Sequence, residues 1–281
     1  MPDRQGAPPQ DRIELVDYHI HTARCGHASG EMAAYVERAV RAGLPEMGFS
    51  DHIFMYWLPP ERRDPVLAMP EDQFGQYVED VYRLRRQYPQ INIRLSVEAD
   101  YIPGHQRTLA EILTRYPWDY VLGSVHFIDE WGIDDARYVA TYAQWDIDEL
   151  YERYFDLVCR GAESGYFDTV AHLDLVKKFG HCPSRDPADL YARVARRLAA
   201  ADVAVEVNTA GLRKPIGELY PHLDLLMACR RAGVPATLGS DAHKAEEVAA
   251  DYSLAIAHLK AAGYERVVSY EERRRDWKPL P

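Results

Sequence analysis

The sequence predicts an α/β fold in which parallel strands form a barrel and helices cover its outside. Short apolar runs rich in β-branched residues alternate along the chain with longer stretches whose apolar residues recur at helical spacing. Strands that alternate with helices pair in parallel, because each helix returns the chain to the same end of the sheet. Seven such units follow one another, which suits a closed or nearly closed barrel, with an open doubly wound sheet as the alternative.

The expected strands are short apolar runs that end at polar or turn-forming residues. They cover residues 13–21, 46–50, 91–99, 120–126, 167–173, 203–208 and 235–240. A further strand is expected over residues 267–270, followed by a polar tail. His, Asp and Glu residues stand at or just beyond the ends of the seven strands, where a parallel barrel collects its functional side chains.

The expected helices lie between these strands. They cover residues 31–43, 71–88, a segment through 109–113, and residues 187–201, 221–232 and 245–262, with more than one helix expected over about residues 138–164. Gly43 ends the first of them, because glycine readily adopts the left-handed backbone that follows a helix. Two long connections, residues 53–70 and 127–137, carry aromatic or acidic side chains. A connection as long as residues 53–70 is uncommon in a compact domain, so we expect it to act as a lid or to contact substrate.

Composition restricts the classes of partner. We expect one domain over residues 13–281, preceded by a flexible, proline-rich arm at residues 1–12. The net charge of −11 argues against a nucleic-acid backbone as partner. No apolar run reaches the length of a membrane span, and the four cysteines form neither a disulfide framework nor a zinc ribbon, so we expect a cytoplasmic protein. The sequence makes no prediction of the oligomeric state.

The first expected strand carries a metal-binding pattern. Asp17, His19 and His21 alternate along it and therefore share one face. Two imidazoles at this spacing can bind one cation, and His27 follows in the next loop. A single His-x-His pattern would more often be a polar strand face with solvated histidines, but similar residues recur at the later strand ends.

The recurring residues form one candidate set. Seven of the 11 histidines and two carboxylates belong to it: His19, His21, His27, His52, Glu98, His126, His172, Asp241 and His243. The remaining histidines, His105, His181, His222 and His258, are expected on surfaces or helices. So many imidazoles at one mouth need compensating partners, and divalent metal ions suit imidazole and carboxylate ligands. Because these residues come from all parts of the chain, the barrel is favoured over the open sheet, whose ligands cluster at one switch point.

Together these motifs resemble the PHP (polymerase and histidinol phosphatase) superfamily over about residues 14–270. The resemblance rests on His19-x-His21 with His27, Ser50-Asp51-His52, Glu98, Gly123-Ser-Val-His126-Phe-Ile128, Ala171-His172 and Ser240-Asp241-Ala-His243. Two stretches are similar to the histidinol-phosphate phosphatase branch, namely Gly123 to Ile128 and Asn208-Thr-Ala-Gly-Leu-Arg-Lys-Pro215, which continues to Pro221. The family fold is a distorted (β/α)7 TIM-like barrel with its metal site at the C-terminal ends of the strands.

The resemblance also implies a trinuclear centre. One metal would be held by His19, His21, Glu98 and Asp241, a second by Glu98, His126 and His172, and the third by His27, His52 and His243. Zinc, iron and manganese all suit these ligands. We therefore expect three divalent metal ions as cofactors.

The expected activity is hydrolysis of a small-molecule phosphate monoester, L-histidinol phosphate, to L-histidinol and phosphate in histidine biosynthesis. A hydroxide bridging the metals would attack phosphorus, because such ions lower the pKa of bound water from 15.7 to about 7. Asp17 is a candidate for protonating the leaving group, although a carboxylate that orients a ligand histidine is as good an interpretation. The phosphate would bind Arg213 first and Lys177 second, with Lys214 and Asn208 nearby.

Two other functions stay open at this point. A related phosphoesterase acting on a nucleotide or oligonucleotide would share the metal ligands but would not need the stretch from Asn208 to Pro221. A non-catalytic metal-binding domain would tolerate degraded ligands, and none is degraded here. For the amine and imidazole of the substrate, the sequence suggests Asp100, Tyr101, Phe54 and Trp57.

Overall fold

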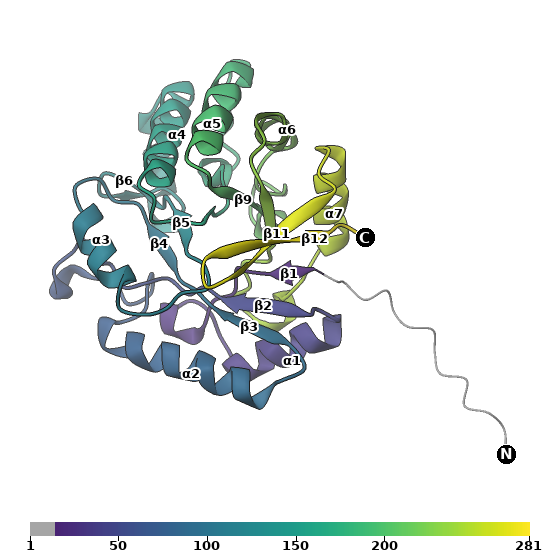
Figure 1. The fold of residues 1–281 in the computed structure, drawn as a ribbon. Helices are drawn as coiled ribbons and strands as arrows, with labels where there is room; N and C mark the ends of the chain where they lie inside the picture. The colour runs from purple at the N-terminus through teal and green to yellow at the C-terminus, as the bar shows by residue number, and fades with distance from the viewer. Residues whose placement is uncertain (1–14) are drawn as a thin grey trace.

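The structure, a computed structural model, describes residues 15–281 and shows an α/β fold of parallel strands surrounded by helices (Figure 1). The arm expected at residues 1–12 lies outside the described residues. None of the helices in the described part of the chain is long and apolar enough to cross a membrane.

The parallel strands form two sheets. The first has the order β1-β2-β3 and consists of β1 (Val16–Asp17), β2 (Glu46–Phe49) and β3 (Asn92–Leu95). The second has the order β10-β9-β8-β5-β4 and consists of β4 (Glu98–Asp100), β5 (Leu122–Ser124), β8 (Thr169–Val170), β9 (Ala204–Asn208) and β10 (Ala236–Gly239). Every neighbouring pair within these two sheets is parallel, as the alternation of strands and helices predicts.

The expected strand over residues 91–99 is divided in the structure. Its first half is β3 and its second half is β4, and the two halves pair in different sheets. Backbone hydrogen bonds also join the sheets. Tyr18 N donates to Leu238 O (3.1 Å), and Glu98 N donates to Asp51 O (3.1 Å). The side chains that follow β1, β2, β4 and β10 are therefore brought to one place.

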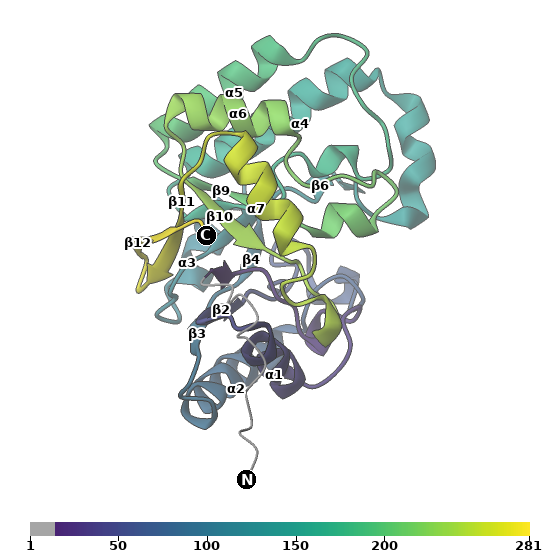
Figure 2. The ribbon, with the colours of Figure 1, turned by 90° about the vertical axis from the view of Figure 1, so that its right-hand side faces the viewer.

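The helices lie at the predicted positions, although the last of them is shorter than expected. They are α1 (Met32–Ala42), α2 (Phe74–Gln87), α3 (Gln106–Leu113), α4 (Ile147–Glu163), α5 (Ala188–Ala200), α6 (Leu223–Ala232) and α7 (Tyr252–Ala261). Figure 2 shows α1 and α2 along the first sheet, and α4, α5 and α6 packed together along the second.

Two helical segments occupy the region over residues 138–164, and the last helix, α7, begins later than expected. A 3-10 segment, Ala136–Gln144, precedes α4, which begins where the Asp146 side chain accepts a hydrogen bond from Glu149 N (3.2 Å). α7 begins only at Tyr252, because Ala249 (φ 55°) and Asp251 (φ 60°) have left-handed backbone that interrupts the helix.

The polar tail expected after residue 270 is not an unstructured tail but includes a strand that the sequence pattern does not predict. It forms β12 (Arg274–Pro279), which pairs antiparallel with β11 (Arg266–Glu271). Two shorter strands, β6 (Phe127–Ile128) and β7 (Trp131–Gly132), form a hairpin inside the loop over residues 127–137.

Buried tyrosines fill the N-terminal end of the strands. Tyr18, Tyr120 and Tyr270 pack with their ring centroids 4.5–5.8 Å apart. Tyr120 Oη donates to Tyr18 O (2.6 Å), and the Tyr18 hydroxyl donates to buried Glu46. This end is closed by aromatic side chains, and the candidate metal ligands lie at the opposite, C-terminal end.

Candidate metal centre

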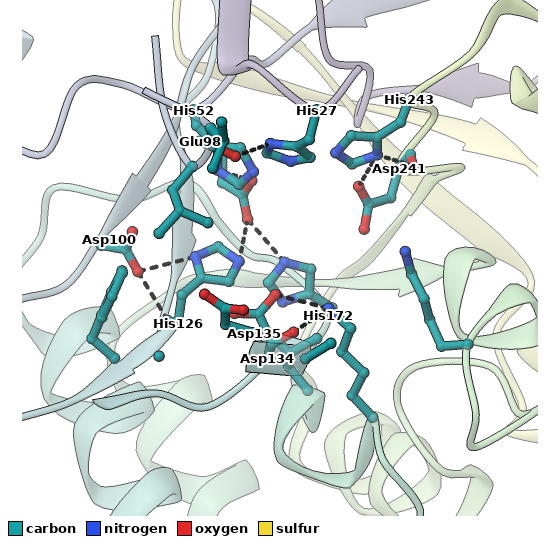
Figure 3. A pocket seen from close by; sticks show the side chains of 18 of the residues that line it. His27, His52, Glu98, Asp100, His126, Asp134, Asp135, His172, Asp241 and His243 are labelled. Carbon is teal, nitrogen blue, oxygen red and sulfur yellow. Dashed lines mark hydrogen bonds and ion pairs between the residues drawn. The ribbon is translucent and has the colours of Figure 1, made fainter. Parts of the chain in front are cut away.

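A cavity of about 520 Å³ lies at the C-terminal ends of the strands. The structure brings all nine candidate ligands together there, from after β1, β2, β5, β8 and β10, from β4 itself and from the loop that holds His27. Most of them line the cavity wall directly (Figure 3), namely His27, His52, Glu98, His126, His172, Asp241 and His243. The other two, His19 and His21, lie beneath them and are fully buried.

Glu98 occupies the centre of the cluster and is 1% exposed. Its Oε2 lies 3.0 Å from His52 Nδ1 and 3.2 Å from His19 Nε2. Its Oε1 lies 2.9 Å from His172 Nε2 and 3.5 Å from His126 Nε2, as Figure 3 shows. Each carboxylate oxygen therefore faces its own group of imidazoles, which is the arrangement that a bridging carboxylate needs.

Asp241 is the second carboxylate of the cluster. Its Oδ1 lies 3.1 Å from His21 Nε2, 3.5 Å from His243 Nδ1 and 3.8 Å from His19 Nε2. The backbone at Asp241 (φ 52°) and at His172 (φ 22°) is left-handed. This conformation is unfavourable for residues other than glycine, so the surrounding structure must hold these two candidate ligands in place.

The donor set fits metal ions. Several buried ligand atoms have no hydrogen-bond partner within residues 15–281, among them Nε2 of His19, His21 and His243 and Oε2 of Glu98. The short contacts of Glu98 Oε2 lack hydrogen-bond geometry. Unpartnered buried polar atoms are costly, and divalent cations would satisfy them. His27, His52 and His243 form one group with ligand atoms within 4.8 Å of one another, and His19, His21 and Glu98 form another.

The same donors can be grouped in more than one way. His52 also groups with Glu98 and His126, and His19 groups with His172 and Asp241. Cys25, which is fully buried, comes close enough to His21 and His243 for the three to share a cation. The cluster is thus compact enough for several neighbouring ions.

Three carboxylates outside the predicted set hold the imidazoles in place. Glu206 Oε1 lies 2.8 Å from His19 Nδ1, Asp51 Oδ1 lies 3.3 Å from His21 Nδ1, and Asp100 Oδ1 lies 3.0 Å from His126 Nδ1. Such contacts fix the ring orientation and leave the other nitrogen free for a metal.

Of these three carboxylates, Glu206 is the one that sequence reasoning missed altogether. The available signal was a carboxylate inside the otherwise apolar strand β9, where an unpaired charge would be unfavourable.

Local charge gives the histidines different protonation properties. Burial alone would lower the pKa of His126, but Asp100 and Glu98 outweigh it and raise the pKa to about 10. Burial, together with the neighbouring His52 and His21, lowers the pKa of His27 to about 4. His27 Nδ1 lies 2.9 Å from Val66 O and 3.0 Å from Cys25 O, so it carries the proton and Nε2 is left as the electron-pair donor.

The long loops supply part of the cavity wall. Val66 and Leu67 come from the connection over residues 53–70, and Phe127 and residues 132 and 134–137 come from the second connection. Arg137 Nη2 lies 2.9 Å from Asp64 Oδ2 and links the two loops at the rim.

Of the predicted phosphate-binding residues, Lys214 lines the cavity, whereas Arg213 and Lys177 are each one position away from a lysine that does. Lys177 is 3% exposed, and its Nζ donates to Leu219 O (2.9 Å) and lies 3.1 Å from Asp174 Oδ2. Arg213 also turns away and donates to Ser240 O (2.7 Å). The neighbouring lysines, Lys178 and Lys214, line the cavity instead.

Asn208 and Asp17 are both buried outside the cavity wall. Asn208 Nδ2 donates to Glu206 Oε2 (2.9 Å) and lies 3.4 Å from Asp241 Oδ2. Asp17 accepts hydrogen bonds from Ser240 N (2.9 Å) and Ala249 N (2.9 Å). This position does not fit the predicted role of Asp17 as proton donor, because its oxygens hold the backbone beneath the cluster.

The residues suggested for the substrate's amine and imidazole do not meet in the cavity. Phe54 and Tyr101 are buried, at 2% and 4% exposure, and Trp57 packs against Phe127 with ring centroids 5.1 Å apart. Asp100 lines the cavity but is engaged by His126. The suggestion is therefore wrong for the aromatic residues.

Comparison with known proteins identifies the family. The PHP domain family model matches residues 17–210. The chain belongs to the PHP domain family. Within this PHP protein the matched segment contains seven of the nine candidate ligands, and the two others, Asp241 and His243, follow it.

Relatives of this PHP protein match it over almost its whole length. A probable histidinol-phosphatase from Deinococcus radiodurans is 38% identical over 262 residues, covering 92% of this chain and 98% of that protein. A histidinol-phosphatase from Bacillus subtilis is 28% identical over 264 residues, covering 84% of this chain and 96% of that protein.

The fold is also that of a solved structure. The crystal structure of histidinol phosphate phosphatase from Lactococcus lactis, complexed with zinc, L-histidinol and phosphate, matches with a TM-score of 0.78 and 23% identity. The match covers 94% of this chain and 99% of that one.

Proposed function

We propose that this PHP protein is a metal-dependent phosphomonoesterase that hydrolyses L-histidinol phosphate to L-histidinol and inorganic phosphate. The observation that carries the proposal is the convergence of nine candidate metal ligands on one cavity, in a chain that matches histidinol-phosphatases over 92% and 84% of its length. A relative of the same fold was crystallised with both products of this reaction. We place the reaction in histidine biosynthesis and in the cytoplasm.

We infer that three divalent ions occupy the cluster. His19, His21, Glu98 and Asp241 would hold the first, Glu98, His126 and His172 the second, and His27, His52 and His243 the third. When bound, such ions lower the pKa of coordinated water and polarise the phosphate oxygens. Zinc in the Lactococcus lactis structure makes zinc the first metal to test, with manganese and iron as alternatives.

The protein's own part is to hold these ligands and the phosphate in place. Glu206 and Asp100 keep the rings of His19 and His126 pointing into the cluster. Lys178 and Lys214 bring positive charge to the cavity wall, and we propose that they bind the phosphate oxygens. This revises the sequence-based choice of Arg213 and Lys177, whose cationic groups are engaged elsewhere.

We also propose that the two sheets together form the closed (β/α)7 barrel of the family. The hydrogen bonds from Tyr18 N to Leu238 O and from Glu98 N to Asp51 O support it, because they lie at the two seams between the sheets. In this description β3 and β4 are two halves of one barrel strand. The helices on the outside and the cavity at the C-terminal strand ends agree with the same architecture (Figure 1).

The proposal is tested by measuring phosphate release by protein loaded with zinc or manganese. L-histidinol phosphate is compared with p-nitrophenyl phosphate, a nucleoside monophosphate and a short oligonucleotide. We expect kcat/KM for L-histidinol phosphate to exceed the others by at least about 100-fold, a difference of about 2.7 kcal/mol. Cleavage of another phosphoester in its place would preserve the metal centre and refute the substrate. Fully metallated protein that cleaves none of them would refute the catalytic proposal.

A further inference from the structure

Two acidic side chains of the cavity, Asp134 and Asp135, are neither candidate metal ligands nor hydrogen-bond partners of the clustered histidines. Five carboxylates line the cavity: Glu98, Asp100, Asp134, Asp135 and Asp241. Glu98 and Asp241 lie within the ligand cluster, and Asp100 orients His126. Asp134 and Asp135 come from the loop over residues 127–137 and lie on the cavity wall near His126 and His172 (Figure 3).

The two loop carboxylates differ in how far they are engaged. Both oxygens of Asp135 accept hydrogen bonds from Arg137, at 2.6–3.0 Å. Asp134 accepts from Lys178 Nζ through Oδ2 (2.9 Å), and no hydrogen bond joins its Oδ1 to another described residue. The Asp134 side chain also retains 28% exposure, against 9% for Asp135. Asp134 therefore presents one free carboxylate oxygen to a ligand in the cavity.

Asp134 and Lys178 form a pair of opposite charges at this wall. Lys178 Nζ donates to both Oδ2 and the backbone carbonyl of Asp134 (2.7 Å), so the ammonium is held beside the carboxylate. L-histidinol phosphate has the complementary arrangement, because its ammonium and its phosphate ester are on adjacent carbon atoms. If the phosphate meets Lys178 and the ligand cluster, the substrate's ammonium comes to the side of Asp134.

We propose that Asp134 is the residue that recognises the ammonium of the substrate and so selects phosphate esters that carry an amine beside the phosphate. The inference rests on the proposed function and deepens it, since it names the chemical feature that the cavity distinguishes. The oxygen that Lys178 leaves free accepts from the substrate ammonium. Phe127 and Leu175, which line the same cavity, provide an apolar wall for the rest of the leaving group.

The test compares two esters that differ in the amine alone. Metal-loaded protein is given L-histidinol phosphate and 3-(imidazol-4-yl)propyl phosphate, which lacks the amine. Hydrogen bonds to a charged group contribute about 10- to 100-fold to such a comparison. We expect the wild-type protein to prefer the amine-bearing ester by about this factor in kcat/KM, and Asp134→Asn to lower the preference to within about threefold of unity.

Two further variants make the result specific. Asp129→Asn changes a carboxylate of the same loop that is 72% exposed, pairs with Arg153 and lies outside the cavity wall, so the preference should be unchanged. Asp135→Asn should also keep most of the preference. If Asp135→Asn abolishes the preference and Asp134→Asn keeps it, the proposal is wrong.

A binding measurement separates recognition from positioning of Lys178. L-histidinol carries the amine but no phosphate, and its inhibition constant should rise about 10- to 100-fold in Asp134→Asn. If Asp134→Asn instead slows both esters equally and leaves L-histidinol binding unchanged, Asp134 only positions Lys178 and the proposal is overturned. Wild-type protein that does not cleave L-histidinol phosphate at all would refute the proposed function itself, which is a different outcome. Metal content and circular dichroism of each variant confirm that it is folded.

Discussion

Replacing Glu206 with glutamine tests whether a carboxylate outside the metal ligands holds the cluster together. Glu206 is 1% exposed, and three donors converge on its two oxygens. Oε1 lies 2.8 Å from His19 Nδ1, while Oε2 accepts from His172 N (2.8 Å) and Asn208 Nδ2 (2.9 Å). Glutamine has the same shape, but it offers one oxygen and one amide NH2 group, so at least one of the three donors loses its acceptor.

The expected effect has two parts. Loss of a partner that orients a ligand histidine typically lowers metal affinity about 10- to 100-fold, equivalent to about 1.4–2.7 kcal/mol. A buried donor without an acceptor costs about 1–3 kcal/mol in the free energy of unfolding, whether or not metal is present. Glu206→Gln should therefore lower both the affinity for zinc and the free energy of unfolding of the metal-free protein. The loss of zinc affinity should be observed in addition to the loss of stability.

The assay is competition for zinc between the metal-free protein and a chromophoric chelator, with urea unfolding of the metal-free protein measured in parallel. Glu46→Gln is the matched control, because Glu46 is also a buried carboxylate at 2% exposure but lies at the opposite end of the strands. It should lower stability, since Glu46 accepts from the Tyr18 hydroxyl and Arg94, and leave zinc affinity unchanged. A folded Glu206→Gln protein with wild-type zinc affinity would show that this reasoning about Glu206 is wrong.

Three further predictions follow from other parts of the structure. Lys178→Met should lower kcat/KM about 10- to 100-fold for every phosphate ester, because Lys178 lines the cavity. Lys177→Met should instead lower the free energy of unfolding by about 3–5 kcal/mol, because it breaks a buried ion pair with Asp174. Equal effects of the two variants on kcat/KM would contradict the assignment. Gly239→Ala should destabilise the fold and lower metal content, because its Cβ would lie 1.8 Å from Glu206 Oε1 and 2.6 Å from His19 Cβ; a variant with full zinc content and wild-type stability would refute this. Burial raises the pKa of Tyr270 to about 12, whereas tyrosine in the unfolded chain ionises near pH 10. The contribution of Tyr270 to stability is therefore retained below pH 10 and is lost by about 1.4 kcal/mol per pH unit as the pH rises from 10 towards 12. Absorbance at the phenolate band should therefore follow unfolding, and a reversible titration of all tyrosines near pH 10 in folded protein would contradict the prediction.

Residues with a local signature were predictable. Every candidate ligand except His27 lies in or just after an apolar run, His27 follows in the loop after the first strand, and the ends of parallel strands lie at one edge, so the nine positions could be expected to meet from the sequence alone. The alternation along the first strand likewise places His19 and His21 on one face. Both arguments need only neighbouring residues and the geometry of a strand.

Residues whose environment depends on distant contacts were not predictable. Glu206 and His19 are 187 positions apart in the sequence, and nothing local indicates that they meet. The strand over residues 91–99 reads as continuous, yet it divides between two sheets because its halves pair with different partners.

The sequence by itself determined the fold class, the order of the strands and helices, and the chemistry of the cluster, because these depend on short-range periodicity and on which side chains can bind a cation. Tertiary structure alone decided which of two adjacent lysines faces the cavity. Lys177 ends a 3-10 turn, Leu175–Lys177, and its ammonium is held by Asp174 and Leu219 O, while Lys178, the next residue, reaches Asp134 on the cavity side. Consecutive residues in such a turn point in different directions, so the partners that surround the turn, and not the sequence of the turn, determine which charge faces the cavity.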